Sequence, residues 1–465
     1  MLKPLALTLL GLALQAHANP ERQAQAMLDA LRELGGAPGL AAAVWQGGKP
    51  RWQGVSGLRD VEQKLPVQPD TRFRLASVSK LFAATAAAQL KAQGRLDVDK
   101  PVGPLLPELE PVLAVLTPRQ LAVHLSGMPH YEGRDAMRGS THHAKASDAL
   151  VHVKGRTLKS APGSIYLYST WGYTLLAATV EAAAGQPYLD LLRTKVAPGL
   201  DIGPDETGKS PTMSGAYAHA FDGLHPAPPH DFSYSWGGAG LAASAPALAE
   251  WGSRVLQGQV LNAATRDWMW QPAQNSAGQP VTERDFRLAF GWRLSEDAQG
   301  QPTVHHAGST LGARSVLMLW PRAATSVSLL SNAMWTSSIE RSADLLSAPF
   351  RAPVPGLAEQ PCPVKATRFT GELDGAPLEE GRAKFQRDAD GLCRGELSLP
   401  PALAKLGNPG PQPASSQWVV IGLQGGLARA ALVTAIGLAD WRAQADGSFR
   451  VTGVVERSLV LRLKE

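Results

Sequence analysis

Ser77 and Lys80 stand three residues apart at the start of an apolar stretch, residues 73–94. Residues i and i+3 share one face of a helix, so this spacing predicts an amine beside a hydroxyl. A serine hydroxyl needs such a neighbouring base to become a nucleophile near neutral pH. The pattern S-x-x-K alone arises about once by chance in a chain of this length, with a capping serine and an exposed lysine as its ordinary explanations. Chemistry at this pair therefore requires support from the rest of the chain.

Tyr168 is a second candidate, because it directly precedes a predicted helix at residues 171–184. A phenol beside a lysine ammonium can be held partly ionised and can pass a proton to a leaving group. The alternative is a core tyrosine, which is the interpretation we favour for Tyr166 and Tyr173.

The sequence His306-Ala307-Gly308-Ser309 lies on a predicted strand and supplies the third group. Gly308 would allow the backbone to approach a substrate closely. The N–H groups of Ser77 and Ser309 would then hold the oxyanion of a tetrahedral intermediate. The alternative is a histidine at a sheet edge. His305 should point to the opposite face of the strand and is interpreted as structural.

The elements around these residues alternate between helix and strand. The first part of the chain predicts a helix at 21–34, a hairpin at 40–46 and 51–56, and the enclosed helix 73–94. A mostly helical region follows, and the strands return between residues 291 and 332, before a closing helix at 336–346. This order predicts an α/β domain whose sheet is completed by the two ends of the region, with a site between the sheet and a helical lobe.

The C-terminal region has a different character. Five prolines between residues 348 and 363 predict a stiff linker, and the short alternating apolar runs after residue 368 predict a small all-β domain. Cys362 and Cys393 are the only cysteines. In an oxidising compartment such a pair is more often a disulfide than two free thiols. Closing a loop of about 30 residues would stabilise the domain by about 3–4 kcal/mol.

The N-terminus resembles a secretory signal: Lys3 precedes an apolar run at residues 5–14 and a small-x-small cleavage site ending at Ala18. The run is shorter than the ~20 residues that a spanning helix needs, so no membrane span is expected. The predicted division is a signal peptide at 1–18, a hydrolase domain at 19–348, a linker at 349–363 and a β domain at 364–465, in a periplasmic or secreted protein.

Composition excludes several classes of function. The 465 residues are 44% hydrophobic and 18% charged, which suits a globular protein, and the formal charge of +5 is dispersed, so nucleic-acid binding is not expected. The sequence has neither the G-x-S-x-G elbow of α/β-hydrolases nor an H-x-H-x-D metal motif. His142 and His143 would bind a metal only adventitiously, and no metal or cofactor is predicted.

Five blocks follow one another along the chain: RLASVSK (74–80), HLSGMPHYE (124–132), PGSIYLYSTWGYTLLAATVEAAAGQ (162–186), WGGAGLAAS (236–244) and HAGSTLGARSVL (306–317). In this order they resemble the penicillin-recognising serine hydrolases, which include class C β-lactamases, D-alanyl-D-alanine carboxypeptidases, D-aminopeptidases and esterases. More closely, YSTWGYTLLAA and HLSGMPHYE resemble the mitochondrial serine β-lactamase-like protein and its bacterial relatives.

The resemblance implies a β-lactamase/transpeptidase-like fold and assigns a role to each candidate. Ser77 would be the acylated nucleophile, Lys80 its base partner and Tyr168 the shared general acid and base. Two positions depart from the class C pattern: Thr170 stands where those enzymes have Asn, and His306 replaces a lysine that attracts a substrate carboxylate. Both differences argue against an efficient β-lactamase. His124 belongs to a matching block, where ordering a loop is its expected role.

These observations predict a secreted serine hydrolase that acts through a Ser77 acyl-enzyme on amide or ester bonds of peptides or small esters. A class C-type β-lactamase or a D-Ala-D-Ala carboxypeptidase is the nearest alternative. A weakly catalytic binding or assembly protein of the cell envelope is an alternative of another class. The expected partner is a small-molecule or peptide substrate, and the oligomeric state stays open.

Overall fold

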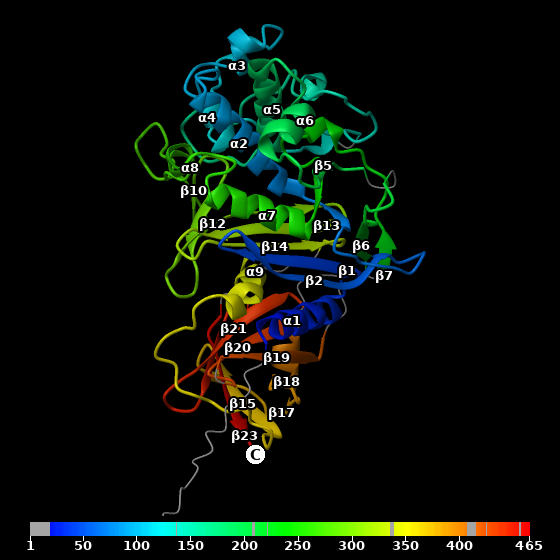
Figure 1. Cartoon of the computed structure of the whole chain (residues 1–465), viewed down its shortest axis with the longest axis vertical. Coiled ribbons are helices and arrows are strands. Elements are labelled where there is room, and N and C mark those ends of the chain that lie inside the picture. The colour runs from blue at the N-terminus through cyan, green and yellow to red at the C-terminus, as the bar shows by residue number, and fades with distance from the viewer. Residues whose placement is uncertain are drawn as a thin grey trace, which may run out of the picture.

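The chain forms an elongated molecule in which a helical lobe, a central sheet and a C-terminal barrel follow one another along the long axis (Figure 1). The structure is a computed structural model that describes residues 19–135, 137–206, 210–220, 222–334, 339–406, 415–424, 426–454 and 457–465. The predicted signal peptide, residues 1–18, lies outside the described residues. None of the described helices combines the length and the apolar character needed to cross a membrane.

The central sheet is antiparallel and brings the two ends of its region together. Its strand order is β3-β2-β1-β14-β13-β12-β11-β10-β9. The bounds are β1 (Gly39–Gln46), β2 (Lys49–Asp60), β3 (Leu65–Pro66), β9 (Thr282–Glu283), β10 (Phe286–Leu288), β11 (Arg293–Glu296), β12 (Pro302–Thr310), β13 (Ala313–Trp320) and β14 (Thr325–Ser331). The pairing of β1 with β14 confirms the predicted closure of the sheet by strands from opposite ends of the domain.

The helical lobe covers one face of this sheet. Its two central helices, α2 (Ser79–Ala92) and α5 (Thr170–Ala184), are rich in alanine and are buried on nearly all sides. Small side chains allow these helices to pack closely against one another, and a single apolar core continues from them to the inner face of the sheet. The remaining elements of the lobe are α3 (Pro111–Ala114), α4 (Pro118–Ala122), α6 (Tyr188–Leu191), α7 (Ala245–Leu256), α8 (Ala263–Met269) and the strands β4 (Arg72–Arg74), β5 (Ile202–Pro204), β6 (Tyr217–Ala220), β7 (Gly223–Pro226) and β8 (Leu241–Ser244).

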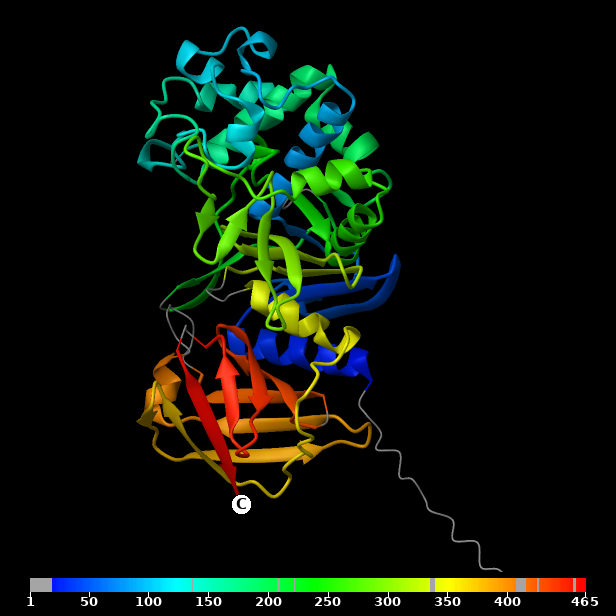
Figure 2. The ribbon, with the colours of Figure 1, turned by 90° about the vertical axis from the view of Figure 1, so that its left-hand side faces the viewer.

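Helices α1 (Pro20–Gly35) and α9 (Ile339–Ser347) lie on the other face of the sheet, between the sheet and the barrel (Figure 2). Both helices are strongly amphipathic, and their apolar residues join a second core. That core contains Val419, Ile421, Ala431, Val433 and Leu438 from the barrel. The two helices therefore bind the barrel to the domain that contains the central sheet by apolar packing.

The C-terminal barrel is a nine-stranded antiparallel sheet that closes through the pairing of its strands β15 and β23. Cys362 and Cys393 form a disulfide at its edge, with their Cα atoms 5.5 Å apart. The barrel contains β15 (Arg368–Leu373), β16 (Ala376–Pro377), β17 (Gly381–Arg387), β18 (Cys393–Ser398), α10 (Pro401–Leu406), β19 (Gln417–Gln424), β20 (Arg429–Thr434), β21 (Gly437–Ala443), β22 (Phe449–Thr452) and β23 (Leu459–Lys464). The predicted fold class is confirmed: an α/β domain with an antiparallel sheet and a helical lobe is followed by a small all-β domain.

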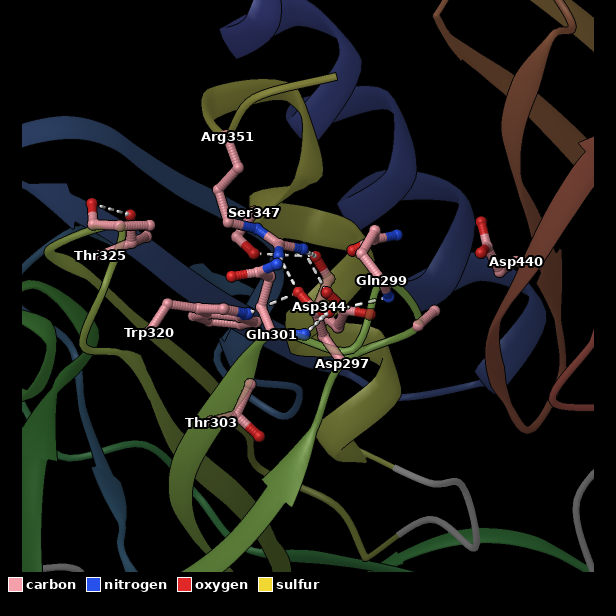
Figure 3. Close-up of polar contacts among 12 residues, drawn as sticks. Asp297, Gln299, Gln301, Thr303, Trp320, Thr325, Asp344, Ser347, Arg351 and Asp440 are labelled. Atoms are coloured by element: carbon pink, nitrogen blue, oxygen red, sulfur yellow. Dashed lines mark hydrogen bonds and ion pairs between the residues drawn. The ribbon is translucent and has the colours of Figure 1, made fainter. Parts of the chain in front are cut away.

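A buried cluster of charges lies where the barrel meets the sheet (Figure 3). Arg351 pairs with Asp297 at 2.7 Å and with Asp344 of α9, while the indole N–H of Trp320 donates to Asp297 at 3.0 Å. These three charged side chains are at most 9% exposed. Burial raises the pKa of Asp344 above its ordinary value, although Arg351 opposes that change. The charges are thus held in this low-dielectric region by one another.

Replacing Arg351 by alanine is expected to lower the free energy of unfolding by about 3 kcal/mol, because two buried carboxylates would lose their cation. Arg368→Ala is the matched control: it removes an ion pair to Glu380 in which both side chains are more than 40% exposed, and it should cost less than about 1 kcal/mol. Urea denaturation of both variants measures the difference. Equal losses would contradict a structural role for the buried cluster.

Candidate active site

Ser77 lies in a single 3-10 turn, Ala76–Val78, directly before α2. The sequence predicted that Ser77 lies near the first turn of the helix, whereas in the structure it lies in the short turn that precedes the helix. The turn is held from outside: the Ser315 hydroxyl of β13 donates to the Leu75 carbonyl at 2.6 Å, and Ala76 adopts a left-handed φ of 46°. A non-glycine residue in that region is uncommon and costs energy, so the fold fixes the serine in a defined position.

Lys80 is fully buried and has three acceptors within hydrogen-bond distance. Its Nζ donates to Ser77 Oγ at 3.1 Å, to Thr170 Oγ1 at 3.1 Å and to the Gly238 carbonyl at 2.8 Å. Three acceptors match the three N–H groups of an ammonium. Burial nevertheless lowers the pKa of Lys80 below its ordinary value, with Tyr168 opposing the shift. This lysine can therefore exchange its proton more readily than an exposed lysine.

Tyr168 completes the arrangement, with its Oη 2.7 Å from Ser77 Oγ. Burial by itself would raise the pKa of this phenol, but the positive charges of Lys80 and Arg293 outweigh it, so the pKa lies below the ordinary value of 10.0. Lys80 Nζ also lies 4.9 Å from the centre of the Tyr168 ring. A phenol with these neighbours is suited to accept a proton from Ser77 and to return it.

His124 supports the segment that carries Tyr168. Its Nδ1 accepts the Ser169 N–H at 3.1 Å, its carbonyl accepts the Leu167 N–H at 2.9 Å, and its ring centre lies 4.4 Å from that of Tyr168. Burial and the charge of Lys80 hold the pKa of His124 well below its usual range, so the ring is neutral. These contacts give His124 a positioning role.

Strand β12 runs beside the nucleophile, and Gly308 is the point of closest approach. A Cβ at this position would lie 2.9 Å from the Ser77 nitrogen and 2.4 Å from the Leu75 carbonyl oxygen, so only glycine fits. Ala307 and the exposed Ser309 line the cleft in front of Ser77. Gly308 thereby allows strand β12 to pass directly beside the Ser77 N–H.

His306 does not supply a positive charge to the cleft. It is 3% exposed, its Nδ1 lies 2.7 Å from the Ala307 carbonyl oxygen, and burial together with Arg293 holds its pKa well below its usual range. The ring is therefore neutral and buried behind the cleft wall. It offers no positive charge to a substrate carboxylate.

His305 points to the opposite face and packs edge-on against Phe286, with ring centres 4.8 Å apart. Neither of its ring nitrogens has a hydrogen-bond partner among the described residues. Burial lowers the pKa of His305 to about 3 from an ordinary value of 6.5. As the pH falls below 6.5, His305 therefore takes up a proton in the unfolded chain but not in the folded protein. The free energy of unfolding decreases over that pH range as a result.

Replacing His305 by leucine is expected to reduce the loss of stability between pH 6.5 and pH 5 by about 1–2 kcal/mol, because this proton uptake by the unfolded chain disappears. Urea denaturation of wild type and His305→Leu at the two pH values measures the effect. An identical pH dependence in wild type and His305→Leu would contradict this role of burial.

Arg293 is a cleft residue that sequence reasoning missed. It lies at the start of β11, lines the same cleft as Ser77, and pairs with Glu283 at 2.7 Å and with Glu340 of α9 at 4.0 Å. Its charge lowers the pKa of Tyr168. The only sequence signal was a single arginine in the apolar run FGWRLS, which by itself does not indicate a site.

The cleft has a volume of about 1060 Å³ and extends well beyond the nucleophile. His130, Thr170 and Arg138 lie along it on the helical-lobe side. No cluster of three or more potential metal-ligating side chains occurs in the part of the chain that the structure describes. His142 contacts Asp231 at 2.8 Å and His143 contacts His152 at 3.0 Å, so both predicted loop histidines have protein partners.

Comparison with known proteins identifies the family. The family model described as beta-lactamase matches residues 24–348, which is more than half of the chain. The chain belongs to the beta-lactamase family. It is thereby a member of the penicillin-recognising serine hydrolases, as the sequence blocks predicted. The matched residues end before the barrel strands begin.

Individual relatives agree with this placement. The serine beta-lactamase-like protein LACTB, mitochondrial, of Homo sapiens is 28% identical over 390 residues, which cover 63% of this chain and 71% of that protein. Esterase EstB of Burkholderia gladioli is 35% identical over 178 residues, covering 35% of this chain and 45% of the esterase. The solved structure of a class C beta-lactamase aligns with a TM-score of 0.60 at 17% identity, over 72% of this chain and 97% of that one. That likeness concerns the fold.

Proposed function

We propose that this protein is a serine hydrolase that cleaves amide or ester bonds of peptides or small esters through a covalent acyl-enzyme at Ser77. The observation that carries the proposal is the position of Ser77 Oγ, which lies within hydrogen-bond distance of both Lys80 Nζ and Tyr168 Oη. A weak nucleophile becomes reactive when a base can take its proton as it attacks. Both candidate bases have a pKa below the ordinary value for their type.

In the acylation step, Tyr168 takes the Ser77 proton while Ser77 Oγ bonds to the substrate carbonyl carbon. The negative charge that develops on the carbonyl oxygen is stabilised by the N–H groups of Ser77 and Ser309. Collapse of the tetrahedral intermediate breaks the bond to the leaving amine or alcohol, which takes the proton from Tyr168. The Lys80 ammonium stabilises the phenolate during the transfer.

Deacylation follows the same route with water in place of Ser77. The water oxygen bonds to the acyl carbon while Tyr168 takes a proton from that water. The bond between Ser77 Oγ and the acyl carbon then breaks, and Ser77 receives the proton from Tyr168. Thr170 accepts a hydrogen bond from Lys80 at 3.1 Å. This bond keeps Lys80 close to Ser77 Oγ and to Tyr168 Oη. No cofactor is required for this cycle.

A peptide or ester substrate is favoured over a β-lactam. His306 is neutral and buried, so the position that holds a carboxylate-attracting lysine in other members offers no charge here. The relationship to an esterase supports ester cleavage. β-Lactamase or D-Ala-D-Ala carboxypeptidase activity is the nearest alternative, and rapid turnover of nitrocefin compared with p-nitrophenyl esters would favour it.

We further propose that the mature protein acts in the periplasm or outside the cell. The signal-like residues 1–18 and the disulfide between Cys362 and Cys393 support an oxidising compartment. We propose a hydrolase domain at 19–348, a linker at 349–363 and a β domain at 364–465 as the functional division.

A fluorophosphonate probe tests the proposed function directly, because such probes modify serine nucleophiles that a protein has activated. The purified protein is incubated with the probe, and the adduct is located by peptide mass spectrometry. We expect a single adduct on Ser77. Failure of wild-type protein to react with fluorophosphonates and with penicillin alike would contradict the proposal and favour the alternative of a weakly catalytic binding protein.

A further inference from the structure

We propose that the C-terminal barrel supplies an apolar subsite of the substrate cleft, which binds the distal apolar end of an extended peptide or ester. This inference rests on the function proposed above and assigns a substrate class to the same site. The observation behind it is that one continuous cleft is lined by Ser77 and also by barrel residues. Those barrel residues are Leu406, Thr434, Ile436, Gly437, Leu438 and Gly453.

The size of the cleft requires an extended ligand if the cleft is to be filled. Its volume of about 1060 Å³ is at the upper end of the ~300–1,000 Å³ typical of small-molecule sites. An ester as small as p-nitrophenyl acetate, bound with its carbonyl at Ser77, would leave most of this space to water. A longer substrate would bury additional apolar surface against the barrel.

The lining of the cleft changes character along its length. Ser77, Tyr168 and Ser309 line the catalytic end. The residues from the central sheet and α9 are mostly charged, with Glu283, Arg284, Asp285, Arg293, Arg314, Glu340 and Arg341, and the apolar Phe286, Leu311 and Met334 lie among the other lining residues. The barrel end carries the half-buried apolar side chains of Leu406 and Ile436, while Leu438 borders the cleft but is 2% exposed and belongs to the second core. This order fits a substrate with a polar middle, such as a peptide backbone, and an apolar group at its far end.

Ile436 is the barrel residue best placed to act in recognition. It lies at the tip of the β20–β21 hairpin, half-buried, and it is not part of the apolar cores formed by the described residues. The Thr434 hydroxyl holds this tip by donating to the Gly437 carbonyl at 2.9 Å and accepting the Ile436 N–H at 3.3 Å. An apolar side chain on a fixed turn, outside the cores, is available to a ligand.

The barrel side of the cleft is also joined to the catalytic end through α9. The Ser342 hydroxyl accepts the Leu438 N–H at 3.2 Å, and the Arg341 side chain lies over Gly453, where a Cβ would come within 2.4 Å of its Cδ atom. In the same turn of α9, Glu340 pairs with Arg293. The hairpin tip therefore has a fixed position relative to the site, as a binding wall must have.

Steady-state kinetics of Ile436→Asp with three esters tests the inference. p-Nitrophenyl acetate is the short reference ester, p-nitrophenyl octanoate lengthens the acyl side, and hexyl acetate, followed by pH-stat, lengthens the alcohol side. We expect kcat/KM to fall about tenfold for at least one long ester, through a higher KM, and to stay within about twofold for p-nitrophenyl acetate. Ile436→Leu should restore the wild-type value.

Val460→Asp is the matched control, because Val460 is another half-buried β-branched residue of the barrel, on β23, and is not among the residues that line the cleft. Thermal unfolding of each variant shows that it is folded. The inference is overturned if Ile436→Asp and wild type respond identically to both long esters, or if Val460→Asp has the same effect as Ile436→Asp. If wild type does not hydrolyse p-nitrophenyl acetate through Ser77, the proposed function itself falls.

Discussion

Replacing Ser77 by alanine is expected to lower kcat/KM for p-nitrophenyl acetate by at least about 10⁴-fold, because the covalent route is lost and Lys80 and Tyr168 have no nucleophile to activate. Any residual rate in Ser77→Ala should come from binding of the ester and its transition state, without a covalent intermediate. Burst kinetics with the same ester measure the acyl-enzyme, and the burst should vanish in the variant.

Ser79→Ala is the control for this substitution. Ser79 lies two residues further along the chain and is fully buried, and its hydroxyl accepts the Leu241 N–H at 3.1 Å. Its removal should cost about 1 kcal/mol of stability and leave kcat/KM within a few-fold of wild type. Loss of activity in both variants, or in neither, would contradict the assignment of Ser77 as the nucleophile.

Replacing Lys80 by methionine should lower kcat/KM by about 10³-fold, because methionine keeps the apolar stem but removes the charge that stabilises the Tyr168 phenolate. The pH profile should move as well. Lys80 lowers the pKa of Tyr168, so without it the phenol ionises at higher pH and the rise of kcat/KM with pH shifts to higher values. Rates measured between pH 6 and pH 10 report both effects.

Lys91→Met on the same helix is the matched control. Lys91 lies outside the cleft, and its Nζ is 4.5 Å from the centre of the Trp268 ring. We expect wild-type kcat/KM and an unshifted pH profile in this variant. If Lys80→Met also keeps the wild-type pH profile, then Lys80 does not set the proton affinity of Tyr168, and the electrostatic account of the site is wrong.

Local sequence patterns were enough to predict the parts of this site that lie close together in the chain. The i, i+3 spacing of Ser77 and Lys80 places both on one side of the chain once this segment turns helically, and Lys80 Nζ accordingly lies 3.1 Å from Ser77 Oγ. Alternating and helical patterns similarly predicted the sheet, the buried helices and the β domain. The change from an expected helical turn to a 3-10 turn at Ser77 depends on Ser315, which no local pattern connects to it.

Which distant residues meet at the site depends on how the whole chain packs. Tyr168 comes within 2.7 Å of a serine 91 residues away because α5 packs on α2, and Arg293 joins them from β11 of the central sheet. The barrel was predictable as a domain, but its place at the end of the cleft was not. Hydrophobic periodicity reports which face of an element is buried, whereas the partner that buries it is chosen by packing across the whole chain.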